Sequence, residues 1–119
     1  LGEKISKHNV SVYLINTGWS GGPYGVGKRI SIKYSRAMVT AALTGAFDIV
    51  KFRHDDLFNL DVPLECPNVP SNILDPKNTW FDKDSYDLSA KKLAQMFVEN
   101  FGKFENVSKE IREAGPINP

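Results

Sequence analysis

The sequence predicts a mixed α/β (α+β) fold with a few strands and two main helices, in one domain over residues 1–119. Strand-like patterns lie in the first half: residues 10–15 are rich in β-branched and aromatic side chains, and residues 29–33 alternate polar and apolar. A helical stripe lies in the last third, where apolar side chains recur every three or four residues. The 119 residues, 41% hydrophobic and 24% charged, fit one globular domain or part of one.

The first predicted strand, residues 10–15, is apolar enough to be buried on both faces. A glycine-rich loop follows at residues 18–27, because glycine reaches backbone conformations that other residues avoid. The alternation of residues 29–33 predicts a second strand in which every other side chain shares one face.

Ser35 or its neighbour is predicted to cap a helix that runs to about Leu43, with Gly45 ending it. Its apolar face is expected to comprise Met38, Ala41, Ala42 and Val39. Short strands are expected at residues 49–52 and 58–62. These elements would alternate along the chain, as in a mixed α/β domain.

Residues 63–76 hold four of the seven prolines, which predicts an ordered but irregular crossing. The clearest helix follows it, and Asp82 or Asp84 can cap its start. Its apolar stripe comprises Tyr86, Ala90, Leu93, Phe97, Phe101 and Phe104. We interpret these aromatic side chains as packing residues, and we expect at most one helical turn after Lys109.

The overall charge and the single cysteine exclude several classes of function. The net charge is +1, from 15 basic and 14 acidic residues, which gives no electrostatic reason to expect nucleic acid or a membrane surface as partner. The longest stretch without Asp, Glu, Lys or Arg, residues 8–27, is interrupted by polar side chains, a proline and five glycines, so it is not the run of ~20 apolar residues that a membrane-spanning helix needs. Cys66 alone forms neither an internal disulfide nor a multi-cysteine zinc site, and we expect a half-buried, unreactive thiol beside Pro67.

Because the chain begins at Leu1 and shows no signal peptide, we expect an intracellular piece of a longer protein.

Residues 22–28 fit the phosphate-loop pattern G-x-x-x-x-G-K after a predicted strand. A phosphate loop also needs free backbone amides, a Ser or Thr after the lysine, and a helix that begins there. Here Arg29 follows Lys28, the next residues alternate like a strand, and Pro23 lacks an amide. The pattern alone therefore favours a structural loop and leaves phosphate binding open.

A basic run follows this loop and comprises Lys28, Arg29, Lys33 and Arg36. Arginine stacks on flat rings and donates hydrogen bonds in a rigid fork, so the run could serve an anionic or aromatic ligand. On a strand, Arg29, Ser31 and Lys33 would share one face. The alternative, a solvated charged face, is the more common outcome for such a run.

Residues 54–56, His-Asp-Asp, offer three possible metal ligands in a row. Adjacent residues on a strand point to opposite faces, so three consecutive ligands rarely converge on one ion. A polar turn is the favoured interpretation. With His8 in the charged N-terminal stretch as the other histidine, the sequence supports no Ser-His-Asp triad.

Residues 16–38 form a run of unusual composition that closely resembles the ATP-utilising phosphoenolpyruvate carboxykinases. Residues 41–45, 66–70 and 72–80 continue the match in order. The resemblance covers nearly the whole chain and weakens after about Phe104. The chain is similar to the final fifth to quarter of such an enzyme.

The resemblance implies that the chain is the C-terminal part of a carboxykinase nucleotide-binding domain. The family reaction converts oxaloacetate and ATP to phosphoenolpyruvate, ADP and carbon dioxide, with Mg²⁺ and usually Mn²⁺. In the family the phosphate loop, the metal ligands and the oxaloacetate-binding arginine lie upstream of this piece. The resemblance therefore implies that residues 22–28 are a structural loop and that the isolated chain is inactive. It also implies a cytoplasmic parent enzyme that is gluconeogenic or fermentative.

Arg29, Ile30 and Ser35 match the family residues that line the adenosine end of the ATP site. Ser35 replaces the threonine expected there, which keeps the hydroxyl and loses a methyl group. The expected partners are ATP and oxaloacetate in the full enzyme, and the remainder of the same polypeptide. Alone, the piece is expected to self-associate through strands that have lost their neighbours. The alternative function is a small, non-catalytic binding or adaptor module.

Overall fold

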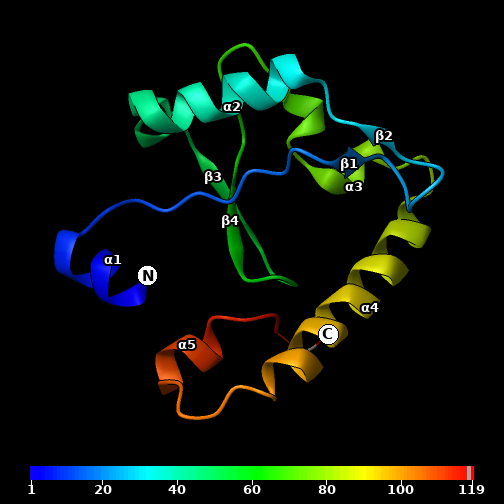
Figure 1. The fold of residues 1–119 in the computed structure, drawn as a ribbon. Coiled ribbons are helices and arrows are strands. Elements are labelled where there is room, and N and C mark those ends of the chain that lie inside the picture. The colour runs from blue at the N-terminus through cyan, green and yellow to red at the C-terminus, as the bar shows by residue number, and fades with distance from the viewer. Residues whose placement is uncertain (118) are drawn as a thin grey trace.

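The computed structural model describes residues 1–117 and 119 (Figure 1). Its elements are, in order, α1 (Gly2–His8), β1 (Trp19–Ser20), β2 (Lys28–Arg29), α2 (Ile32–Thr44), η1 (Ala46–Asp48), β3 (Phe52–Asp55), β4 (Leu60–Pro63), η2 (Ser71–Ile73), α3 (Pro76–Thr79), α4 (Lys83–Phe101) and α5 (Lys109–Glu113). The described strands form two antiparallel hairpins, β1–β2 and β3–β4. The predicted α/β class, with α2 and α4 as its main helices, is confirmed.

The hydrophobic core lies under α2, between this helix, the 3₁₀ turn η1 and the irregular crossing after β4. Its buried members are Ala41, Phe47, Cys66 and Val69. Partly buried side chains from the same elements, Met38 and Ala42 among them, pack against this cluster. The Phe47 ring also lies 5.3 Å from the Tyr13 ring, centroid to centroid. The long N-terminal segment is thereby held against the core.

Helix α2 ends as the sequence predicts. Gly45 adopts a left-handed conformation with φ 76°, and its amide donates to the carbonyl of Ala41. A side chain at this position would be strained, which is why glycine commonly follows a helix. On the predicted apolar face, Ala41 is buried but Val39 is exposed.

The start of α2 differs from the prediction. Ser31 is the N-cap residue and the helix begins at Ile32, so a strand over residues 29–33 is wrong beyond Arg29. Only two residues of β2 pair with β1. A run of five residues that alternate polar and apolar fits both a strand and the start of a helix. In the described structure, no hydrogen-bonded pairing with β1 extends the strand beyond Arg29.

The predicted strand at residues 10–15 is also wrong, because this segment runs without strand pairing in the described structure. Val10, Val12 and Leu14 are exposed along it. An apolar β-branched segment becomes a strand only where a neighbour supplies hydrogen bonds, and none does so here. Helix α1, which precedes this segment, was not predicted.

The second hairpin is present but shifted by one to three residues from the predicted strands at 49–52 and 58–62. Its turn is held by Asp55, whose carboxylate accepts from the amides of Leu57 at 3.0 Å and Phe58 at 2.9 Å. Asn59, in the left-handed region at φ 57°, closes the turn. Asn is one of the few residues that tolerates this conformation.

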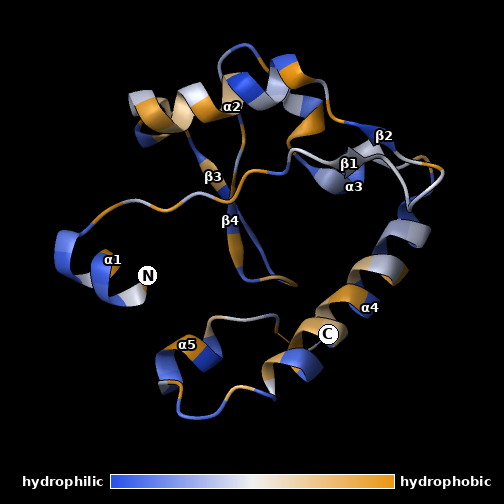
Figure 2. Ribbon diagram, in the orientation of Figure 1, coloured by the Kyte–Doolittle hydropathy of each residue, from blue (hydrophilic) through white to orange (hydrophobic). Residues whose placement is uncertain are grey.

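Helix α4 starts at the predicted cap. The Asp82 carboxylate accepts hydrogen bonds from the amides of Asp84 and Ser85. On its apolar stripe Ala90 is buried, whereas Leu93 and Phe97 are about half exposed. Figure 2 shows hydrophobic and hydrophilic stretches alternating along α4. The tail forms the five-residue helix α5, slightly longer than the single helical turn predicted.

Candidate functional site

The glycine-rich segment that resembles a phosphate loop is the turn of the β1–β2 hairpin. Lys28 lies in strand β2 and pairs with β1, whereas a phosphate loop would begin a helix there. The carbonyl of Pro23 accepts from the amides of Val26 and Gly27, both at 3.0 Å. These amides are engaged within the turn, so they are not available to wrap a phosphate.

Gly27 is required by the close packing of this hairpin. A Cβ atom at Gly27 would lie 2.6 Å from the carbonyl oxygen of Gly22 and 2.9 Å from that of Ser20. The Ser20 hydroxyl donates to the Thr79 hydroxyl at 3.1 Å, which ties the hairpin to α3. The turn is therefore a compact support for the residues that follow it.

The three residues matched to an adenosine site lie where this hairpin runs into α2 (Figure 1). Arg29 ends β2 with an exposed side chain. Ile30 is half-buried, and its amide donates to the Gly18 carbonyl at 2.8 Å. Ser35 lies in the first turn of α2 and is half-buried. The structure thus puts all three at one junction, although Ser35 lies on a helix and not just after a strand.

A shallow cleft of about 370 Å³ opens beside this junction, lined by Ser35, Arg36, Val39 and Thr40. Sequence reasoning did not assign Val39 or Thr40 to a site. Their spacing in the sequence could have indicated this. Val39 lies four residues after Ser35 and Thr40 four residues after Arg36, which places each pair on the same side of the helix.

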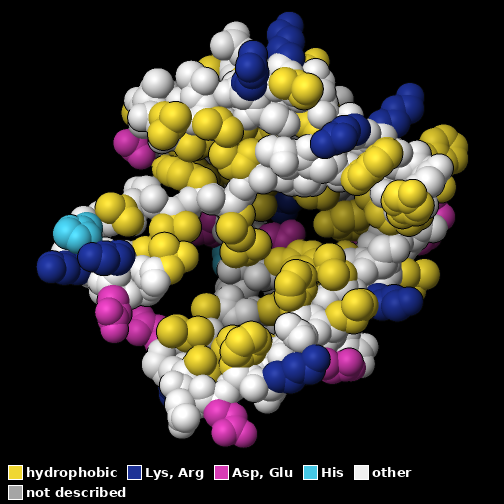
Figure 3. Space-filling model, in the orientation of Figure 1, with side chains coloured by type: hydrophobic (Ala, Val, Ile, Leu, Met, Phe, Trp, Pro, Cys, Tyr) yellow, Lys and Arg dark blue, Asp and Glu magenta, His cyan; other side chains and the backbone are white. Residues whose placement is uncertain are grey.

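The basic run also lies at this junction. Lys28, Lys33 and Arg36 are exposed, and Figure 3 shows basic side chains over α2 and β2. The first turn of α2 holds no acidic residue, so the positive end of the helix dipole adds to these charges. The predicted shared strand face of Arg29, Ser31 and Lys33 is wrong, because Lys33 is helical and Ser31 is the cap.

The His54–Asp56 segment does not gather into a metal site. Within the described residues no group of three or more His, Cys, Asp or Glu side chains is placed to hold a metal ion. His54 Nδ1 instead lies 2.9 Å from Asp61 Oδ1 on the opposite strand of the hairpin. The hydrogen bond to Asp61 raises the pKa of His54 above its ordinary value of 6.5.

We expect replacement of Asp61 by asparagine to lower the pKa of His54, measured by NMR titration of the imidazole. Asp56→Asn is the matched control, because Asp56 acts on His54 only through space and should shift the pKa less. A raised folded-state pKa means that the pair stabilises the hairpin below pH ~6.5 and loses this contribution as the pH rises through the raised pKa. A His54 pKa that is equal in both variants would contradict the assignment.

Cys66 is more deeply buried than predicted, with 5% of its surface exposed in the core under α2. Its Sγ donates to the Pro67 carbonyl at 3.7 Å. Burial raises the pKa of the thiol. A thiol that is kept protonated and covered is a poor nucleophile, which agrees with the interpretation as an unreactive residue.

Residues 1–72, which contain the hairpin, the junction and α2, match the phosphoenolpyruvate carboxykinase family. The chain is 60% identical over 116 residues to phosphoenolpyruvate carboxykinase (ATP) of Caldanaerobacter subterraneus subsp. tengcongensis. It is 59% identical over 117 residues to the enzyme of that name from Fusobacterium nucleatum, and 55% identical over 117 residues to that of Thermus thermophilus.

The chain belongs to the phosphoenolpyruvate carboxykinase family. Each of these matches covers 98% of the chain but only 22% of the relative. The chain therefore spans about a fifth of the length of the carboxykinases that it matches. In the part of the chain that the structure describes, no helix has the length and apolar character needed to cross a membrane.

Proposed function

We propose that the chain supplies the adenosine contacts of an ATP-dependent phosphoenolpyruvate carboxykinase, which converts oxaloacetate and ATP to phosphoenolpyruvate, ADP and carbon dioxide. Family membership supports the reaction. The observation that supports the role of this piece is the junction of β2 and α2, where Arg29 and Ile30 are followed within one helical turn by Ser35, which lines a cleft.

The three residues have different roles in this proposal. The Arg29 guanidinium, exposed at the end of β2, lies over the purine or reaches the ribose. Ile30 gives apolar contact to the base. The Ser35 hydroxyl, in the first turn of α2, hydrogen-bonds the edge of the adenine.

The reacting phosphates, Mg²⁺, Mn²⁺ and oxaloacetate bind residues outside this chain in the proposed enzyme. Phosphoryl transfer depends on positioning the triphosphate and its metal ions, so the isolated chain is proposed to be inactive. The remainder of the same polypeptide is accordingly its first partner. The parent enzyme is proposed to be cytoplasmic and to act in gluconeogenesis or fermentation.

Arg29→Ala in the full-length enzyme tests the proposal. Contacts to adenosine are made equally in the ground and transition states, so their loss raises KM for ATP more than it lowers kcat. A stacked or charge-assisted contact is worth about 1.4–2 kcal/mol, which is roughly a ten- to thirtyfold rise in KM. The measurement is steady-state kinetics with ATP varied at saturating oxaloacetate.

Lys28→Ala is the matched control, because Lys28 precedes Arg29 in the same strand and is also exposed. It should change KM for ATP by less than about threefold, as a charge outside the contact contributes little. An unchanged KM with a collapse of kcat in Arg29→Ala would place Arg29 in the chemistry and contradict the proposal. A loss of turnover in Lys28→Ala would contradict the interpretation of the glycine-rich turn as a structural loop that does not bind phosphate.

A further inference from the structure

The chain exposes far more surface than a compact protein of its mass. Its accessible surface is 9452 Å², whereas a free-standing monomer of 13.3 kDa exposes about 6,500 Å². Its radius of gyration is 15.7 Å, against about 13.5 Å for a compact domain of this length. The excess of roughly 3,000 Å² is surface that a folded protein would normally cover.

An open cleft of about 320 Å³ lies between the β3–β4 hairpin and the first half of α4. Its walls are mainly apolar and include Phe58, Leu60, Val62, Trp80, Tyr86 and Leu93. The rings of Trp80 and Tyr86 meet edge to face at 5.7 Å, which fixes one end of the cleft. Burial, aided by the nearby carboxylates of Asp55 and Asp75, raises the pKa of Tyr86.

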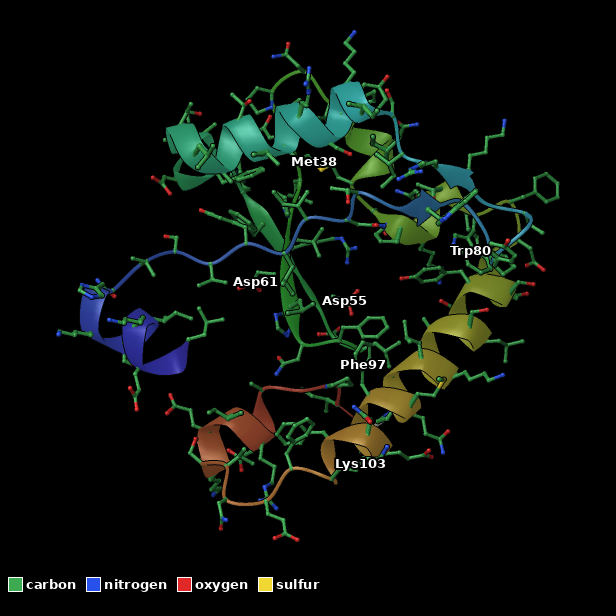
Figure 4. All side chains as sticks on the ribbon, viewed as in Figure 1. Met38, Asp55, Asp61, Trp80, Phe97 and Lys103 are labelled. Carbon is green, nitrogen blue, oxygen red and sulfur yellow. The ribbon has the colours of Figure 1, made fainter. Side chains whose placement is uncertain are left out.

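The apolar wall continues along α4 beyond the cleft. Leu93 is 46% exposed and Phe97, one turn later, is 53% exposed. Ala90 and Ala94 on the same side are buried, so the helix is already docked and its larger side chains remain in water. Figure 4 shows Phe97 on the side of α4 toward the β3–β4 hairpin. We name Tyr86, Leu93 and Phe97, together with the cleft, the α4 face.

The charged groups at the rim of the α4 face are already paired. Lys77 Nζ lies 2.7 Å from Asp87 Oδ2, and Arg53 lies 3.1 Å from Asp75. An occupant therefore needs no charge of its own to satisfy them. The chemistry of the face favours aliphatic or aromatic side chains.

We infer that the α4 face seats an apolar segment from the remainder of the same polypeptide. This rests on the proposal that the chain acts within a full-length carboxykinase, since more than three-quarters of each relative lies outside the match. A second copy is the weaker candidate. Covering the whole excess in two copies would bury about 6,000 Å² in total, which is at the upper end for permanent dimers, whose interfaces run from roughly 2,000 to beyond 5,000 Å².

Cysteine labelling of the full-length enzyme tests this inference. Leu93→Cys reports on the α4 face, and Lys92→Cys, exposed on the other side of the helix, is the matched control. Each variant is treated with a polar thiol reagent, and labelling of the unsubstituted enzyme is subtracted. We expect position 93 to react at least tenfold more slowly than position 92, because a covered thiol is shielded from reagent. Phe97→Cys is a second reporter with the same expectation.

Equal labelling rates at positions 92 and 93, in variants that retain turnover, would overturn the inference. Protection that decreases as the enzyme is diluted would also overturn it, because a second copy would then be the cover. If a cysteine variant has normal turnover and its α4 face reacts readily with the reagent, the inference about the α4 face fails but the proposed role of Arg29 does not. The kinetics of Arg29→Ala test that role separately.

Discussion

Phe47→Ala should destabilise the 119-residue chain by about 3–5 kcal/mol, the usual cost of deleting a buried aromatic side chain. Phe47 is only 6% exposed and lies in the cluster with Ala41, Cys66 and Val69. Its ring also contacts that of Phe52, at 6.5 Å between centroids. Removal would leave a cavity where α2, η1 and the β3–β4 hairpin meet. Since few other residues are buried, the loss approaches the whole stability of a small domain.

The measurement is urea unfolding followed by far-ultraviolet circular dichroism. Phe81→Ala is the matched control, because it makes the same chemical change at a side chain that is fully exposed. It should change the free energy of unfolding by no more than about 0.5 kcal/mol. If Phe81→Ala cost as much as Phe47→Ala, the core would lie elsewhere than under α2.

The features that the sequence predicted correctly are those set by local chemistry. Gly45 ends α2 because a left-handed residue is needed there, and Asp82 caps α4 because a carboxylate satisfies its first amides. Both signals act within four residues of their own position. The long helical stripe of α4 likewise repeats often enough for its period to be unambiguous.

The features that were missed depend on segments distant in sequence. Residues 10–15 have the composition of a strand, but strand formation requires a partner that the described chain does not bring alongside. Residues 29–33 fitted two periodicities, and only the two-residue ladder with β1 decides where the strand ends. Phe47 was not recognised as a core residue, because its burial depends on the crossing after β4.

The candidate site was only partly accessible to sequence reasoning. Arg29, Ile30 and Ser35 came from family resemblance, not from the spacing of their side chains, and their role as adenosine contacts remains a proposal. The structure adds that the three residues lie where β2 runs into α2, and that Ser35 lines a cleft with Arg36, Val39 and Thr40. It also shows that the glycine-rich segment, which fits the phosphate-loop pattern, is the turn of the β1–β2 hairpin.

Gly27→Ala in the full-length enzyme should therefore lower kcat/KM for ATP roughly ten- to thirtyfold, and by no more than Arg29→Ala does, although Gly27 is not proposed to touch the nucleotide. The added Cβ would lie 2.6 Å and 2.9 Å from two backbone oxygens, those of Gly22 and Ser20. Backbone oxygens inside a hairpin cannot rotate away, so β1 and β2 must separate. Arg29 would then shift, and because a displacement of about 1 Å is enough to forfeit a positioned contact, the loss approaches that of removing the Arg29 side chain.

Gly25→Ala is the matched control for this prediction. Gly25 has φ 90°, so alanine is strained by about 1–2 kcal/mol, but its Cβ would meet open space. The strain falls on the tip of the turn and should leave kcat/KM for ATP within about threefold of the unsubstituted enzyme. Steady-state kinetics with ATP varied measures the effect on nucleotide use, and thermal unfolding without nucleotide measures the effect on stability.

Equal values of kcat/KM for ATP in Gly27→Ala and Gly25→Ala would contradict a hairpin that positions Arg29. A large kinetic loss in Gly27→Ala with no loss in Arg29→Ala would mean that the hairpin positions a different residue of the nucleotide site.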